Sequence, residues 1–205
     1  SDTKAYARLL QSSIARFWGR WVTSHTDPKY IPEPGEDVGF RIGKFGRYHW
    51  QKHGEDCWLQ RGPVSMEVME HSAEQMLAHM DFAGVDMALL HRAYYQGIGN
   101  DFHADCVRRF PERLQALAYV PEWRVAGDVK GSAAVVERAV REQGLHGLHW
   151  LPESLDLYGL HGAWDGEEFR RFWDIFAGLG VPVFFTLNPR GEPRLESYLE
   201  ELRTL

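Results

Sequence analysis

Residues 74–91 read EQMLAHMDFAGVDMALLH, and this stretch decides the fold class. Its first half repeats apolar residues at three- and four-residue steps, with Leu77 and Met80 among them, which predicts a helix with one buried face. Gly84 suits the end of that helix. The second half, residues 85–91, is a nearly continuous apolar run, which is typical of a strand that is buried on both faces.

The same alternation of helix and strand continues toward the C-terminus. The apolar runs start at intervals of roughly 30 residues with helical patterns between them, which is typical of βαβ units and a parallel sheet. We therefore expect four adjacent parallel strands in sequence order, at residues 85–91, 114–120, 145–151 and 181–187. Further helices are expected at residues 101–110, 132–143, 166–179 and 193–205, the second of them capped by Ser132.

The N-terminal part has a different texture. Residues 4–21 repeat apolar side chains at helical spacing, whereas residues 24–64 are aromatic, polar and rich in proline and glycine without a clean period. Long irregular connections of this kind are usually functional lids or disordered segments, and the aromatic content favours a lid. We expect it to cover the C-terminal ends of the strands. The predicted domain division is residues 1–70, a helix with a lid-like insertion, and residues 71–205.

Composition limits the class of function. The 205 residues carry a formal charge of −6 and 44% apolar residues, which excludes a disordered chain and argues against a nucleic-acid binder. No apolar run is long enough for a membrane span. Cys57 and Cys106 form no CxxC motif, and reduced thiols are the simplest reading. We expect a cytoplasmic homo-oligomer that binds a small-molecule substrate, with neither a nucleic acid nor a membrane as partner.

Four segments in this order resemble the amidohydrolase-related family, which includes the aminocarboxymuconate-semialdehyde decarboxylase group. The first, residues 74–91, resembles its MD-x-x-GVD-x-A-L motif, and NDFHADCVRRFPERLQALAYVP at 100–121 resembles its FP-x-R-hydrophobic-A-x-V-P motif. The other two, residues 135–152 and 168–186, resemble its next crossover and its F-x-x-F-W … L-G-V-P-V segment. The resemblance covers roughly residues 72–190.

The resemblance implies a partial (β/α)8 TIM-barrel-like α/β fold and an enzyme. The family's reactions are metal-dependent hydrolysis or non-oxidative decarboxylation of a small aromatic or carboxylated compound, with a divalent metal, zinc or manganese. Its HxH ligand pair is missing from this chain, and Thr186 stands where the family places a third ligand histidine. We therefore expect no metal ligands within residues 1–205, either because the chain is truncated or because it is a subunit that borrows its site.

Polar and aromatic residues at the ends of the predicted strands are the candidate substrate contacts, because barrel active sites lie there. His146 and His149 are three apart on one strand and face opposite ways, so they cannot hold one metal together, and His149 lies nearer the useful end. The substrate-binding candidates are His91, Tyr94, His149, Trp150, Thr186 and Asn188, with Tyr48 and His53 from the lid segment. For Thr186 we expect a hydrogen bond to a substrate carboxylate or carbonyl. No catalytic residue is assigned.

Two other functions stay open at this point. The threonine at position 186 favours a non-catalytic accessory or binding subunit, because threonine is a poor metal ligand beside imidazole. An unrelated open α/β protein is the third hypothesis, and a doubly wound strand order would support it.

Overall fold

The chain divides into two compact units, Ser1–Ser72 and Ala73–Leu205. The computed structural model describes residues 41–52, 54–60, 63–68, 71–92, 99–157, 160, 164, 166–187 and 192–204. The expected helix at 4–21 lies outside these described residues, as do three substrate-binding candidates, His53, Tyr94 and Asn188.

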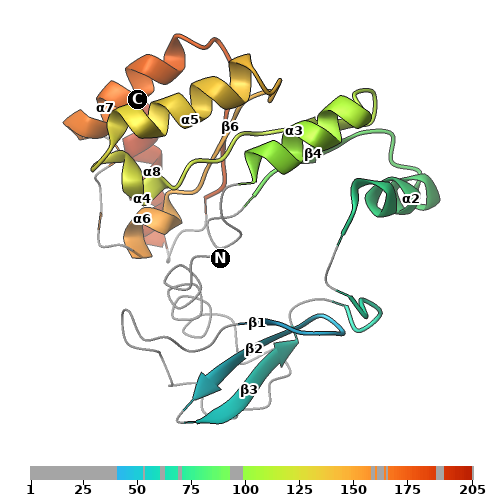
Figure 1. The fold of residues 1–205 in the computed structure, drawn as a ribbon. Helices are drawn as coiled ribbons and strands as arrows, with labels where there is room; N and C mark the ends of the chain where they lie inside the picture. Colours follow the sequence, from blue (N-terminus) through green and yellow to red (C-terminus); the bar gives the residue numbers. More distant parts are fainter. Residues whose placement is uncertain are drawn as a thin grey trace. The chain divides into compact units, whose positions relative to one another are not determined.

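The first unit carries a three-stranded antiparallel sheet in the order β1-β2-β3 (Figure 1). Its strands are β1 (Arg41–Ile42), β2 (Arg47–Lys52) and β3 (Glu55–Gln60). Lys52 pairs with Glu55, so the turn between β2 and β3 has only two residues. Gly54 in this turn has a φ of +83°, a conformation that tight hairpins need and glycine adopts without strain.

This sheet corrects the expectation that residues 24–64 are irregular, as far as the segment is described. Trp50 and Cys57 pair across the two strands and are buried, whereas Asp56 beside them is exposed. Such alternation marks a half-buried hairpin. In the sequence, the alternation is short and is flanked by glycines and prolines, so it does not stand out as a strand pattern. That the segment covers the strand ends of the other unit stays a prediction.

The second unit is built on four parallel strands that are adjacent in sequence order, as predicted. They are β4 (Ala88–Leu90), β5 (Leu114–Ala116), β6 (Leu148–Trp150) and β7 (Val183–Phe185). β4 pairs with β5 and β6 with β7, and a parallel bridge between Ala118 and Leu148 joins the two pairs. The regular pairing is shorter than the apolar runs, because successive residues after β5 bond to different neighbours. Leu117 N–H donates to the oxygen of Leu90 in β4 at 2.9 Å, and Ala118 N–H donates to the oxygen of Gly147, just before β6, at 2.7 Å.

Each of these strands is followed by a helix, which gives the α/β architecture seen in Figure 1. The longer helices are α2 (Ala73–Ala83), α3 (Asn100–Arg109), α5 (Val129–Arg141), α7 (Glu167–Ala177) and α8 (Glu192–Thr204). Two short helices that were not expected, α4 (Glu122–Val125) and α6 (Glu153–Leu157), lie after β5 and β6.

The main core lies between the sheet and α7. Phe169, Phe172 and Phe176 form the buried face of this helix, as its apolar spacing predicts. Trp150 of β6 is fully buried against them, with its ring centroid 6.0 Å from Phe169 and 5.7 Å from Phe172. Burial of several aromatic side chains in one layer makes this packing a dominant stabilising contribution.

One predicted helix cap is wrong. Helix α5 begins at Val129 and is capped by Asp128, whose side chain accepts a hydrogen bond of 2.9 Å from Gly131 N–H. Ser132 lies inside the helix and is buried. Aspartate and serine are about equally good caps, so capping preference alone does not decide whether the helix begins after Asp128 or after Ser132.

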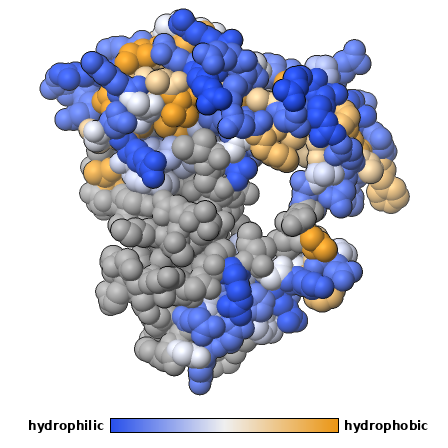
Figure 2. Space-filling model, viewed as in Figure 1, coloured by the Kyte–Doolittle hydropathy of each residue, from blue (hydrophilic) through white to orange (hydrophobic). Residues whose placement is uncertain are grey.

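Much of the described surface of the second unit is hydrophilic, with separate apolar residues among the charged ones (Figure 2). Phe82, Phe102 and Phe184 are exposed large hydrophobic residues of this unit. None of the described helices is long and apolar enough to cross a membrane.

Candidate functional site

The candidate site lies at the carboxyl ends of β4, β6 and β7. His91 directly follows β4, His149 is the middle residue of β6, and Thr186 directly follows β7. Parallel strands bring these ends to the same edge of the sheet, where ligands of α/β folds bind. The structure thus brings together three of the residues that the sequence singles out from separate segments.

His149 is the centre of this cluster. Its side chain is buried, and its Nδ1 lies 2.7 Å from the backbone oxygen of Arg92. Its Nε2 lies 2.8 Å from Oγ1 of Thr186. Both ring nitrogens therefore have partners, from the chain just beyond β4 on one side and from the end of β7 on the other. This arrangement fixes the orientation of the imidazole.

Two aromatic rings complete the cluster. The ring of His91 meets that of His149 edge-on, with centroids 4.4 Å apart. Phe184 lies 6.1 Å from His149 and stacks on His91 at 6.5 Å. His91 and Phe184 are exposed, and Thr186 is half-buried. The cluster therefore presents aromatic faces and one hydroxyl next to a buried, oriented imidazole.

Burial controls the charge of this site. Desolvation lowers the pKa of His149 below its usual value, and the nearby His91 acts in the same direction, while the bond to the Arg92 carbonyl opposes it. His103 of α3 is likewise buried, and desolvation lowers its pKa. Its Nδ1 lies 3.3 Å from the backbone oxygen of Leu117. Both imidazoles are therefore held toward the neutral form.

The remaining described candidates do not join this cluster. Trp150 points into the core against α7, because neighbouring residues on a strand face opposite sides and His149 takes the site-facing position. We therefore leave Trp150 out of the site. Tyr48 lies on β2 of the other unit, opposite Leu59, and stays a prediction. His146 is exposed just before β6.

The sequence analysis did not identify the buried carboxyl group of Glu122. Glu122, the first residue of α4, is fully buried. It accepts hydrogen bonds from Leu151 N–H at 3.0 Å, from the hydroxyl of Ser154 at 2.9 Å and from that of Tyr119 at 3.1 Å. Desolvation raises its pKa to about 7, against the effect of these bonds. A glutamate in the apolar run VPEWRV, directly after a predicted strand, was the available signal.

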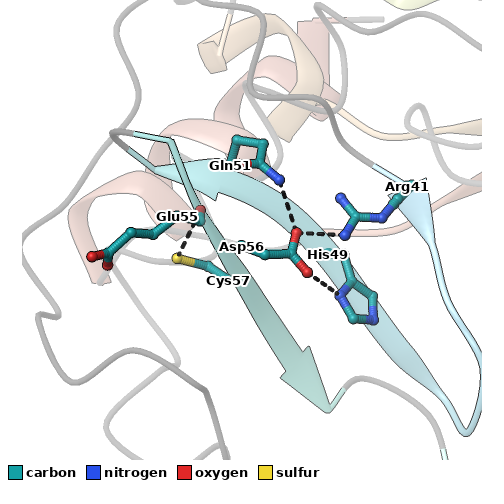
Figure 3. Close-up of polar contacts among 6 residues, drawn as sticks. All are labelled: Arg41, His49, Gln51, Glu55, Asp56 and Cys57. Carbon is teal, nitrogen blue, oxygen red and sulfur yellow. Dashed lines mark hydrogen bonds and ion pairs between the residues drawn. The ribbon is translucent and has the colours of Figure 1, made fainter.

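The first unit holds a separate polar cluster around Asp56 (Figure 3). Its carboxylate pairs with the guanidinium of Arg41 and accepts a hydrogen bond of 2.9 Å from the amide of Gln51. Nδ1 of His49 lies 3.4 Å from the other oxygen. The hydrogen bond from Arg41 is the main reason why the pKa of Asp56 lies below its usual value. The charge of Arg41 is thus paired within the sheet.

The described residues do not fit a metal centre. Within the described part of the chain, no three His, Cys, Asp or Glu side chains are grouped so that they could hold one ion. At the candidate site itself, Nε2 of His149 is hydrogen-bonded to Thr186. Among the described residues of this cluster, the exposed imidazole of His91 is then the one ring left to bind an ion. No step of a reaction is therefore assigned to a metal held by these residues.

Comparison with known proteins gives only structural relatives. No family model and no curated protein matches the chain. An amidohydrolase II is similar with a TM-score of 0.49 and 13% identity over 67% of this chain and 51% of its own. A 5-carboxyvanillate decarboxylase of Novosphingobium aromaticivorans, solved with manganese, gives 0.46 and 20% over 65% and 40%. A probable 2-pyrone-4,6-dicarboxylic acid hydrolase of Acinetobacter baumannii gives 0.45 and 19% over 65% and 45%.

The chain spans about half or less of the length of these structures.

Proposed function

We propose that this chain is part of an amidohydrolase-related enzyme that acts on a small aromatic or carboxylated compound. The order of family-like motifs along residues 72–190 supports the family, and the parallel strands in sequence order agree with part of a barrel. The reaction is hydrolysis or non-oxidative decarboxylation, and neither is favoured by the described residues.

The observation that carries this proposal is the meeting of His91, His149 and Thr186 at one edge of the sheet. Three strands that are far apart in sequence deliver polar side chains to the position where barrel enzymes bind substrates. The exposed rings of His91 and Phe184 supply a surface on which an aromatic ligand can stack. We assign His91, Phe184 and Thr186 to the substrate-contacting wall of the site, and the buried His149 positions Thr186 from behind.

A second candidate function is a non-catalytic binding subunit. It is favoured by Thr186, which stands where the resemblance implies a ligand histidine, and which is engaged with His149 instead. A divalent metal such as zinc or manganese would then need ligands from outside the described residues.

An assay of the chain with hydroxybenzoates and aromatic lactones separates the two functions. It is run with added Mn²⁺, with added Zn²⁺ and with a chelator, and it follows both CO₂ release and ring opening. The enzyme proposal expects turnover of one compound class and a loss of at least tenfold in kcat/KM for His149→Phe, with no loss for the exposed control Glu142→Gln. Saturable binding without turnover under all conditions supports the binding subunit instead.

A further inference from the structure

The hydroxyl of Thr186 has a fixed hydrogen-bond polarity. The backbone oxygen of Arg92 can only accept a hydrogen bond, so Nδ1 of His149, 2.7 Å away, must carry a proton. In a neutral imidazole Nε2 then has a lone pair and no proton. Oγ1 of Thr186, 2.8 Å from Nε2, must therefore donate. A threonine hydroxyl has one proton, so its oxygen has only lone pairs left for a ligand.

The neutral state of His149 follows from its surroundings. The ring is buried, and desolvation lowers its pKa. The titratable side chain in ring contact with it is His91, whose protonation would also oppose a charge on His149. Phe184 and Thr186, which face it from the end of β7, carry no charge. Around neutral pH the imidazole thus accepts at Nε2 and donates at Nδ1.

Thr186 is partly exposed and lies next to an exposed aromatic ring. The side chain is half-buried, and Phe184, two residues earlier in the chain, is 50% exposed. Residues two apart on a strand share a face, so an aromatic ligand stacked on Phe184 can direct a substituent toward Thr186. The exposed ring of His91 stacks on the same Phe184 and flanks this position.

We propose that Thr186 is a specificity-determining residue that recognises a hydrogen-bond donor of the ligand, a hydroxyl or amino group on an aromatic ring, and that His149 and the Arg92 carbonyl set this polarity. The inference rests on the proposed function for the ligand class. It reverses the expectation of a carboxylate at Thr186, because two acceptors facing each other repel. Donor groups on a ligand are selected, and acceptor groups are rejected.

The first test is the protonation state of His149, measured by long-range ¹H–¹⁵N NMR on the full chain at pH 7.5. The proposal expects a protonated Nδ1 and an unprotonated Nε2. A proton on Nε2, or an imidazolium at this pH, overturns it. This measurement needs neither ligand nor turnover, so its outcome is independent of whether the proposed enzyme activity exists.

The second test compares phenol with anisole, which lacks the donor proton, by ligand-observed NMR titration. Wild type should bind phenol about five- to tenfold more tightly, since one hydrogen bond separates the two probes. Thr186→Val should remove this ratio, Thr186→Ser should keep it, and the control Thr204→Val in α8 should leave it unchanged. No phenol preference in wild type, an unchanged preference in Thr186→Val, or no binding of either probe overturns the proposal.

Discussion

The side-chain amide of Asn100 forms two hydrogen bonds with the backbone of Tyr119. Its Nδ2 donates to the Tyr119 oxygen at 3.0 Å, and its Oδ1 accepts from the Tyr119 N–H at 2.9 Å. Asn100 is buried at the first position of α3. The amide therefore bonds both the N–H and the carbonyl group of Tyr119 and attaches the start of the helix to the chain after β5.

Asn100→Asp tests this connection. The carboxylate has no proton to offer the Tyr119 oxygen, so two buried acceptors meet, and we expect a loss of about 2 kcal/mol in the free energy of unfolding. Urea denaturation followed by circular dichroism gives the value. Asp101→Asn, at the exposed next position of the same helix, should cost less than about 1 kcal/mol. Equal losses in the two variants would show that the amide bridge has no special role.

Gly147 lies where β6 and β7 approach each other too closely for a larger side chain. A methyl group at this position would lie 2.5 Å from the backbone oxygen of Pro182 and 3.1 Å from Leu117. Leu148 N–H donates to the same Pro182 oxygen at 3.0 Å, so Gly147→Ala must displace the β6–β7 pairing. We expect a loss of about 1–3 kcal/mol. Gly127→Ala, whose nearest contact would be 3.8 Å, is the matched control and should be tolerated; a tolerated Gly147→Ala would refute the close approach.

Glu122 predicts how stability changes with pH. Burial raises its pKa to about 7 in the folded chain from 4.5, so the folded state holds this proton more tightly than the unfolded state. Its contribution to stability is full below about pH 4.5 and is lost as the pH rises through about 7, by up to roughly 3 kcal/mol. The amide of Glu122→Gln is neutral and can still bond Leu151, Ser154 and Tyr119.

Thermal unfolding of wild type and Glu122→Gln between pH 5 and 8.5 measures this effect. The stability of the variant relative to wild type should increase with pH, and the difference between the two isolates Glu122 from His103 and His149. Those imidazoles have lowered pKa values, so they act in the opposite direction and reduce stability as the pH falls below 6.5. A difference that does not depend on pH would mean that Glu122 is ionised throughout.

The sequence predicted the second unit better than the first. Apolar runs and helical spacing place the four strands in their observed order, because buried parallel strands and amphipathic helices leave strong local patterns. The hairpin at β2 and β3 was missed, since its alternation is short and glycines surround it. The start of α5 was misplaced from Asp128 to Ser132, which is a choice between two good caps.

The candidate site was predictable only in part. Position at the end of a strand pointed to His91, His149 and Thr186, but only the paired strands show that His149 bonds Thr186 and the Arg92 carbonyl. That relation depends on residues far apart in sequence. Trp150 packs in the core instead, because a position at a strand end does not determine which side chain faces the core.

The polarity of Thr186 predicts a pH-dependent preference. When His149 is protonated, Nε2 must donate to Oγ1, and the threonine proton then turns toward the ligand. Because burial lowers the pKa of His149, this reversal occurs below pH 6.5. Binding of benzoate, an acceptor, should therefore strengthen in acid more in wild type than in Thr186→Val, as measured by NMR titration at several pH values. Identical pH profiles in the two proteins would argue against the reversal.

If the strand ends carrying His91, His149 and Thr186 form the ligand site, chemical-shift mapping with 4-hydroxybenzoate will locate the bound ligand there. The isotope-labelled chain is titrated at pH 7.5, and the shifted resonances are assigned. We expect saturable shifts concentrated at His91, His149, Phe184 and Thr186. Shifts concentrated instead on β2 and β3, or on the outer faces of α3 and α5, would contradict it.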